Sequence, residues 1–137
     1  MNSIAGIQED IVEEFAMVGD DFDQYSYLIE LSCIFEPMKP ELKSDDRSVK
    51  GCQSHVWLDI YQDGDGLFEF DADSDTLIIK GVLFLLQRVL CGQKPTDVAS
   101  ADITFLARTA IMETFESDRR KGIGYVIATL KRAAAAM

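Results

Sequence analysis

The sequence predicts one α+β domain in which a small antiparallel sheet packs against helices. Two short segments that alternate apolar and polar residues flank the turn signal Asp63–Gly66, as the arms of a β-hairpin do. Several longer segments repeat apolar residues at helical spacing. The chain has 137 residues, the size of one domain, and shows no internal repeat. We therefore expect residues 1–137 to form a single unit, with residues 1–6 frayed.

The first third of the chain predicts two helices. Apolar residues recur at helical spacing from Ile7 to Phe15, acidic residues occupy the opposite side, and Gly19 ends the helix. Asp20 or the aspartate after it can cap a second helix that extends to about Phe35. The prolines within residues 36–46 then exclude a regular helix and predict a loop.

The middle of the chain predicts a sheet of three strands. Residues 47–50 are expected to form a short strand, residues 56–61 alternate as a half-buried strand, and residues 67–70 return beside them. Asp63 and Asp65 in the connecting turn resemble the start of a calcium-binding loop. Gly66 comes two residues too early for that loop, and strands flank it, so the segment predicts a hairpin turn.

The second half of the chain predicts helices around a buried one. Residues 76–90 are apolar on nearly every side, which is typical of a helix at the centre of a domain, and Gly92 suits its C-terminal cap. A short helical turn over residues 95–99 and a helix over residues 103–115 are expected to follow. Asp118 can cap a last helix that reaches the alanine-rich end.

The composition counts against nucleic acid and membranes as partners of this protein. The 24 acidic residues against 13 basic ones give a net charge of −11, which repels phosphate backbones and counts against nucleic-acid binding. The most apolar run is too short and too charged to span a bilayer, so we expect no membrane segment. The N-terminus shows no signal peptide, and the three cysteines lack disulfide or zinc spacing. A cytoplasmic protein with reduced thiols is the expectation.

Cys52 is the candidate reactive residue. It follows Gly51 and precedes the polar pair Gln53 and Ser54, so its thiol is expected on a loop supported by the strand that begins at Val56. A thiolate on such a loop is a nucleophile that another molecule can reach. Cys33 falls next to the inward face of the second helix and is expected to pack in the core or at its boundary. Cys91, at the end of the apolar helix, is expected to be structural.

The segment Gly51-Cys52-Gln53-Ser54-x-Val56-Trp57 resembles the signature of the SufE family, sulfur-acceptor proteins of iron–sulfur cluster assembly. Further segments fit the family's pattern in the same order over roughly residues 21–135. They are Tyr27–Leu31, Arg47–Lys50, Ala72–Asp75, Ile79–Val82, Pro95–Val98 and Arg119-x-x-Gly122. The resemblance implies a fold similar to that of scaffold proteins of the IscU type. His55 is a minor departure from the family picture.

The resemblance also implies a function. Cys52 would attack the persulfide of a SufS-like cysteine desulfurase, carry the sulfur as a transient persulfide and pass it to an iron–sulfur scaffold complex. The protein would stimulate the desulfurase and turn over little alone. No metal or prosthetic group of its own is expected, because the pyridoxal phosphate belongs to the desulfurase. Gly51, Gln53, Ser54, His55 and Arg119 are expected to support the loop or contact the partner.

Two alternatives from other classes stay open at this point. A stand-alone cysteine-dependent hydrolase or transferase would use His55 as the general base for Cys52, although the chain shows no glycine run typical of an oxyanion hole. A binding module would hold an iron–sulfur cluster or metal itself. The cysteines are separated by 19 and 39 residues, which matches no known ligand spacing.

Overall fold

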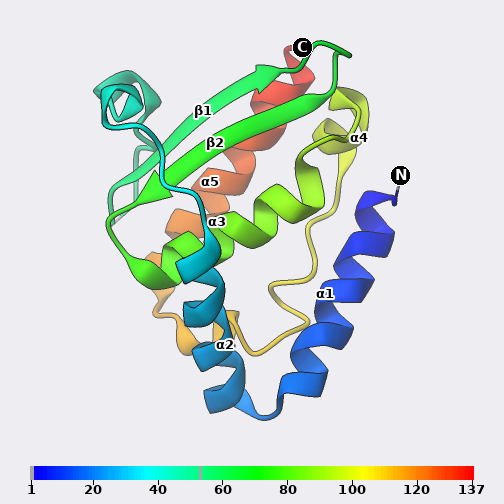
Figure 1. The fold of residues 1–137 in the computed structure, drawn as a ribbon, viewed down its shortest axis with the longest axis vertical. Helices are drawn as coiled ribbons and strands as arrows, with labels where there is room; N and C mark the ends of the chain where they lie inside the picture. The colour runs from blue at the N-terminus through cyan, green and yellow to red at the C-terminus, as the bar shows by residue number, and fades with distance from the viewer. Residues whose placement is uncertain (1, 53) are drawn as a thin grey trace.

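The computed structural model describes residues 2–52 and 54–137 and confirms the α+β class. The elements follow in the order α1 (Ile4–Val18), α2 (Asp21–Ile34), β1 (Val56–Gln62), β2 (Phe68–Ser74), α3 (Leu77–Leu90), α4 (Pro95–Ser100) and α5 (Ser117–Ala135). Short 3₁₀ turns lie at Pro40–Leu42, Asp45–Arg47 and Met112–Thr114. An antiparallel hairpin lies on one side of α3, and the pair α1–α2 lies on the other (Figure 1).

The central position predicted for the apolar helix is confirmed in α3. Leu85, Leu86 and Val89 are fully buried there. α3 packs against β2 and against α2, and Gly81 lies in close contact with Leu28 of α2. A Cβ at Gly81 would lie 2.6 Å from the backbone oxygen of Leu28, so only glycine permits this helix crossing.

The sheet has two strands, and the prediction of a third strand over residues 47–50 is wrong. β1 and β2 pair antiparallel, with Leu58 opposite Ala72. Among the described residues before β1, the strand prediction is reduced to one isolated bridge, between Ser48 and Trp57. The reason is local: the 3₁₀ turn Asp45–Arg47 ends just before this bridge, and Gly51 turns the chain just after it.

The N-terminal helix begins earlier than the sequence predicted. α1 starts at Ile4, where the Ser3 hydroxyl caps it by accepting a hydrogen bond from the Gly6 N–H at 3.0 Å. The prediction of fraying over residues 1–6 is therefore wrong from Ser3 onward, while residue 1 lies outside the described residues. In α2 the predicted Asp20 cap is confirmed by its hydrogen bond from the Asp23 N–H.

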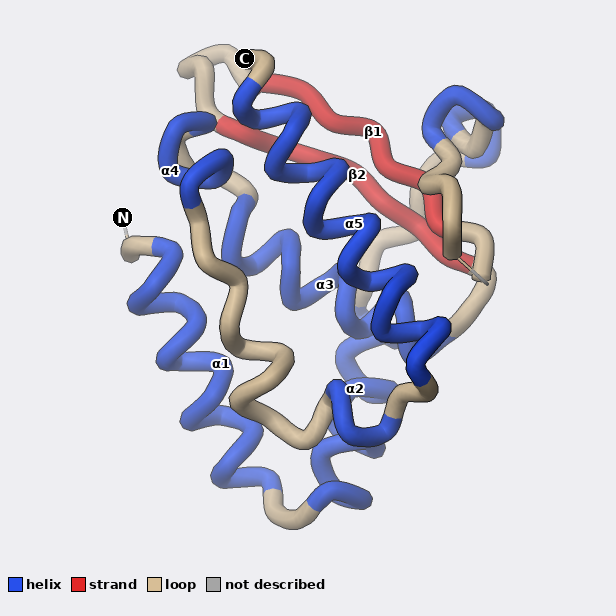
Figure 2. Tube along the Cα trace, turned by 180° about the vertical axis from the view of Figure 1, so that it is seen from behind, coloured by secondary structure: helices blue, strands red, loops and turns tan. Residues whose placement is uncertain are grey.

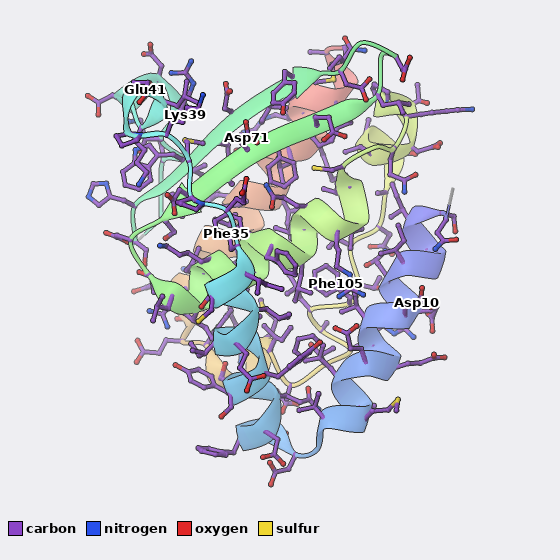
Figure 3. All side chains as sticks on the ribbon, viewed as in Figure 1. Asp10, Phe35, Lys39, Glu41, Asp71 and Phe105 are labelled. Atoms are coloured by element: carbon purple, nitrogen blue, oxygen red, sulfur yellow. The ribbon has the colours of Figure 1, made fainter. Side chains whose placement is uncertain are left out.

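The predicted helix over residues 103–115 is also wrong, because this segment forms turns and one short 3₁₀ helix. The buried Gln8 of α1 explains part of the difference. Its side-chain oxygen accepts hydrogen bonds from the backbone N–H groups of Thr104 and Phe105. The segment runs beside α1 (Figure 2), and the fully buried Phe105 lies between α1 and α3 (Figure 3).

The last helix runs behind the hairpin and brings its N-terminal half to the loop that precedes β1 (Figures 1 and 2). α5 begins at Ser117 after the cap residue Glu116, so the predicted cap Asp118 instead occupies the first turn. Ile123, Val126 and Leu130 face the core. Among the helices of the described residues, none has both the length and the apolar character needed to cross a membrane.

Candidate functional site

The loop over residues 50–55 is held at both ends by backbone hydrogen bonds. On the entering side, the N–H of Val49 donates to the carbonyl oxygen of Val56 at 2.8 Å. On the leaving side, the His55 N–H donates to a carboxylate oxygen of Asp75 at 3.1 Å, and the Asp75 N–H donates to the His55 carbonyl at 3.3 Å. Cys52 therefore lies between two positions, Val49 and His55, that hydrogen bonds to Val56 and Asp75 hold in place.

Ser54 adds a side-chain tether to the same loop. Its hydroxyl accepts a hydrogen bond of 2.7 Å from the hydroxyl of Thr76, the residue directly before α3. The expected supporting role of Ser54 thus has a geometric basis, because the bond joins the loop to the central helix of the core.

Cys52 is partly buried against the N-terminal half of α5. Its Sγ donates a hydrogen bond to the carbonyl oxygen of Gly122 at 3.4 Å. A Cβ at Gly122 would lie 3.4 Å from this sulfur and 3.5 Å from the Cys52 Cα. The missing side chain at position 122 therefore leaves the space beside the thiol free.

A small cavity opens beside Cys52. It offers about 20 Å³ to a water-sized atom, slightly more than the roughly 10–15 Å³ that one such atom requires. The apolar part of its lining comes from β1, α3 and α5: Val56, Ile79, Ile123 and Val126. Ser54 and Arg119 complete the lining. The cavity is thus an apolar space for one atom at the end of the Cys52 side chain.

The electrostatics at Cys52 favour the protonated thiol in this conformation. Burial raises the pKa of the Cys52 thiol above its ordinary value. Lys50, two residues away, is exposed. The sequence left open which group activates the thiol. In the conformation described, the thiol is partly shielded from water, and this shielding disfavours the thiolate.

His55 does not meet Cys52 as a general base would. Its ring stacks on Trp57, with ring centroids 5.5 Å apart and an interplanar angle of 20°. Trp57 is in turn covered by the ammonium group of Lys43, 5.3 Å from the ring centroid. Within residues 2–52 and 54–137, no hydrogen bond joins the His55 ring to the thiol, and His55 is exposed.

The remaining predicted residues take different positions. Arg119 lies in the first turn of α5, where it lines the cavity and places its guanidinium carbon 5.7 Å from the ring centroid of Phe115. Gly51 has a φ of +89°, a conformation that side chains other than glycine rarely adopt. Gln53 falls outside the described residues.

Tyr125 is a site residue that sequence reasoning missed. A Cβ at Gly51 would lie only 2.6 Å from the Tyr125 ring, so the loop backbone rests directly on this aromatic side chain. Tyr125 follows Gly122 by three residues on α5, and both therefore reach the same loop. That spacing is the only sequence signal for the contact, and it could not show that the loop lies there.

A buried ion pair holds the neighbouring loop over residues 36–46. Asp73 of β2 is 1% exposed, accepts a hydrogen bond from the Met38 N–H and lies 2.9 Å from the Lys43 ammonium. Burial alone would raise the pKa of Asp73, but hydrogen bonds from Lys43 and from the Ser74 N–H outweigh it and lower that pKa. The loop carries Lys39 and Glu41 at the side of the hairpin, near Asp71 (Figure 3).

The other two cysteines lie apart from this site. Cys91 is half-buried at the end of α3, where burial raises the pKa of its thiol to about 12, in line with its predicted structural role. Cys33 is exposed on α2, so the prediction that it packs in or beside the core is wrong. Its Sγ contacts the Ile29 carbonyl within the same helix at 3.6 Å.

The acidic turn between the strands is a hairpin turn, as predicted. One carboxylate oxygen of Asp63 accepts hydrogen bonds from the N–H groups of Asp65 and Leu67. Among the described residues, no group of three or more histidine, cysteine, aspartate or glutamate side chains is arranged to hold a metal ion.

Comparison with known proteins finds a solved structure of similar fold and a protein family that matches the sequence. A solved structure, the solution structure of a hypothetical protein from Thermus thermophilus, matches with a TM-score of 0.77 and 18% sequence identity. The match covers 95% of this chain and 94% of that one, and at this identity it concerns the fold alone. The family described as "SufE: Fe-S metabolism associated domain" matches residues 9–134. Because this match spans nearly the whole chain and includes the Cys52 loop, the protein belongs to the SufE family and has a role in iron–sulfur metabolism.

Proposed function

We propose that the protein is a sulfur acceptor and carrier that receives persulfide sulfur from a cysteine desulfurase onto Cys52. The observation that carries the proposal is the cavity for one atom beside the Cys52 Sγ. A terminal sulfur bonded to Sγ is of the size that this space accepts. Its mainly apolar lining would keep water, oxidants and reductants away from a persulfide.

The transfer step is a thiol–disulfide type of exchange. The Cys52 thiolate attacks the terminal sulfur of the donor persulfide, a new S–S bond forms on Cys52, and the S–S bond of the donor breaks. The donor cysteine leaves as a thiolate and takes up a proton. Because the resting thiol is shielded and its pKa is raised, the loop over residues 50–55 must move Cys52 outward to react.

The supply and the use of the sulfur belong to other proteins. The donor is a SufS-like desulfurase, which carries the pyridoxal phosphate, and the recipient is an iron–sulfur scaffold complex. The family's association with iron–sulfur metabolism supports this pairing. The alternative of a stand-alone hydrolase or transferase has little support, since the His55 ring stacks on Trp57.

Desulfurase turnover tests this function. Alanine release from L-cysteine is measured with a cysteine desulfurase alone, with this protein, and with its Cys52→Ser and Cys91→Ser variants. We expect stimulation by the wild type and by Cys91→Ser and none by Cys52→Ser, because Cys52 lies at the cavity that accepts one sulfur. Equal stimulation by the Cys52→Ser variant would contradict the proposal.

A further inference from the structure

The positive charge of this acidic chain is concentrated on its last helix. α5 contains five of the 13 lysines and arginines and one of the 24 acidic residues. The helix therefore carries a net charge of +4 in a chain of net −11, and the rest of the chain carries −15. Residues 1–36 lie at the other extreme, because they include no lysine or arginine. The two charge signs are thus segregated by element.

Three of the five cations of α5, Arg120, Lys121 and Arg132, are exposed. We call the outer α5 face the exposed residues Arg120, Lys121, Gly124, Tyr125 and Arg132. Positions 121, 125 and 132 recur at spacings that place them on one side of a helix. A Cβ at Gly124 would meet no atom within 4 Å, so there is open space at this position. In Figure 2, α5 runs along the front of the molecule.

None of the ion pairs within residues 2–52 and 54–137 uses the three cations of this face. Arg120 donates to the backbone oxygen of Met112 and Arg132 donates to the Thr129 hydroxyl, so the hydrogen bonds of these two guanidinium groups among the described residues go to uncharged acceptors. Exposed arginine and tyrosine beside a small residue are also the residue types that interfaces favour.

The outer α5 face is continuous with the Cys52 loop. Tyr125 supports Gly51 directly, and the carbonyl of Gly122 accepts the hydrogen bond of the Cys52 thiol. The exposed Lys50 adds a further positive charge on the loop itself. A molecule seated on this face would therefore touch the residues that hold the thiol in its cavity.

We propose that the outer α5 face is the docking surface for an acidic surface of the protein that donates sulfur to Cys52. This inference rests on the proposed function and adds the position and the charge of the contact. Attraction between the basic helix and an acidic surface accelerates the diffusional association of the two proteins. Repulsion between that surface and the acidic remainder of this chain favours approaches in which α5 faces the partner. Nucleic acid is disfavoured as the occupant because the −15 of the remaining residues repels phosphate.

Matched charge reversals test the proposal. Lys121→Glu with Arg132→Glu changes the outer α5 face, and Lys39→Glu with Lys94→Glu makes the same change in net charge at exposed positions elsewhere. The rate of sulfur transfer from a cysteine desulfurase to each double variant is measured at low and at high salt. We expect the first variant to be about 10-fold slower at low salt and less sensitive to salt, and the second to stay within about twofold of the wild type.

Controls separate the possible failures. Alkylation of Cys52 by iodoacetamide should be equal in the wild type and both double variants, since neither pair of residues touches the thiol. If the wild type accepts no sulfur, the proposed function itself fails. If it accepts sulfur and the two double variants are slowed equally, the docking surface is wrong. Binding of a labelled oligonucleotide that Lys121→Glu with Arg132→Glu abolishes would also overturn the proposal and assign the face to nucleic acid.

Discussion

At the scale of single residues, the surroundings of Cys52 favour the neutral thiol over the thiolate. The Cys52 Sγ donates to the Gly122 carbonyl and lies over an apolar cavity, and burial raises its pKa. Both features favour a neutral sulfur at rest. They also suit a carrier, since the same shielding would protect a bound sulfur atom between donor and recipient.

The pH dependence of alkylation at Cys52 should report this burial. In the folded protein the raised pKa means that the thiolate appears only at a pH above that of an exposed cysteine, about 8.5. The stability contributed by the buried thiol is complete below that pH and falls as the pH rises through the folded-state pKa. Iodoacetamide labelling of the Cys52 peptide, followed by mass spectrometry, should show a midpoint above that of the unfolded chain. A midpoint equal to or below the unfolded value would contradict the account.

Tyr125 should restrain the loop through Gly51. Tyr125→Ala removes the ring that supports the Gly51 backbone, so the loop should open more often and the apparent pKa of Cys52 should fall toward its ordinary value. A fall of one unit would raise alkylation near neutral pH by about tenfold. Tyr125→Phe should behave as the wild type, because the contact uses ring carbons.

Thr129→Ala is the matched control for this change. Thr129 lies one turn further along α5, and its hydroxyl donates to the Tyr125 carbonyl without reaching the loop. Its alkylation profile should equal that of the wild type. An unchanged profile in Tyr125→Ala, with a folded circular dichroism spectrum, would show that Tyr125 does not restrain Cys52.

At the scale of elements, the site depends on how closely α3 approaches its neighbours. α3 supplies Ile79 to the cavity, and Thr76 at its start tethers Ser54 of the loop. Two residues after Ile79, Gly81 sits against the backbone of α2. A change in the α2–α3 crossing would therefore be transmitted to the floor of the site.

Gly81→Ala should destabilise the fold by about 1–3 kcal/mol, because the added methyl group meets backbone rather than a movable side chain. Gly124→Ala on the open side of α5 is the control, and it should stabilise by up to about 1 kcal/mol through helix propensity. Urea denaturation measures both. A Gly81→Ala variant as stable as the wild type would show that the helices can separate without cost.

The elements also show what the sequence could not predict. The amphipathic and apolar periods correctly predicted α1, α2, α3 and the hairpin, since local spacing decides which side of each is buried. Residues 103–115 have apolar residues typical of a helix. Two backbone N–H groups of this segment, those of Thr104 and Phe105, instead donate hydrogen bonds to the side chain of Gln8, almost a hundred residues earlier. A hydrogen bond over that separation leaves no local pattern.

At the scale of the whole molecule, neighbouring residues in the sequence predicted that Cys52 lies on a loop. They did not predict which side chains surround it. Gly51 and the strand after it predicted a supported loop, and the structure has one. The contacts with Gly122 and Tyr125 depend on α5 crossing behind the hairpin, which only the assembled fold determines. His55, three residues after Cys52 in the sequence, stacks its ring on Trp57.

One hydrophobic core joins both strands to the long helices, so the chain should unfold as a unit. We expect a single transition in urea, with coincident curves from tryptophan fluorescence at Trp57 and from far-ultraviolet circular dichroism. Trp57 reports the hairpin, whereas the dichroism reports mainly the helices. Two separated transitions would show that the hairpin and the helices are independent domains.

The most direct test of the account is the intact mass of the protein after incubation with a cysteine desulfurase and L-cysteine. We predict a gain of one sulfur atom that a thiol reductant reverses, because a persulfide exchanges with thiols. The gain should be absent in Cys52→Ser and kept in Cys33→Ser and Cys91→Ser. A wild type that gains no sulfur, or a Cys52→Ser variant that still gains one, would contradict the assignment of Cys52 as the acceptor.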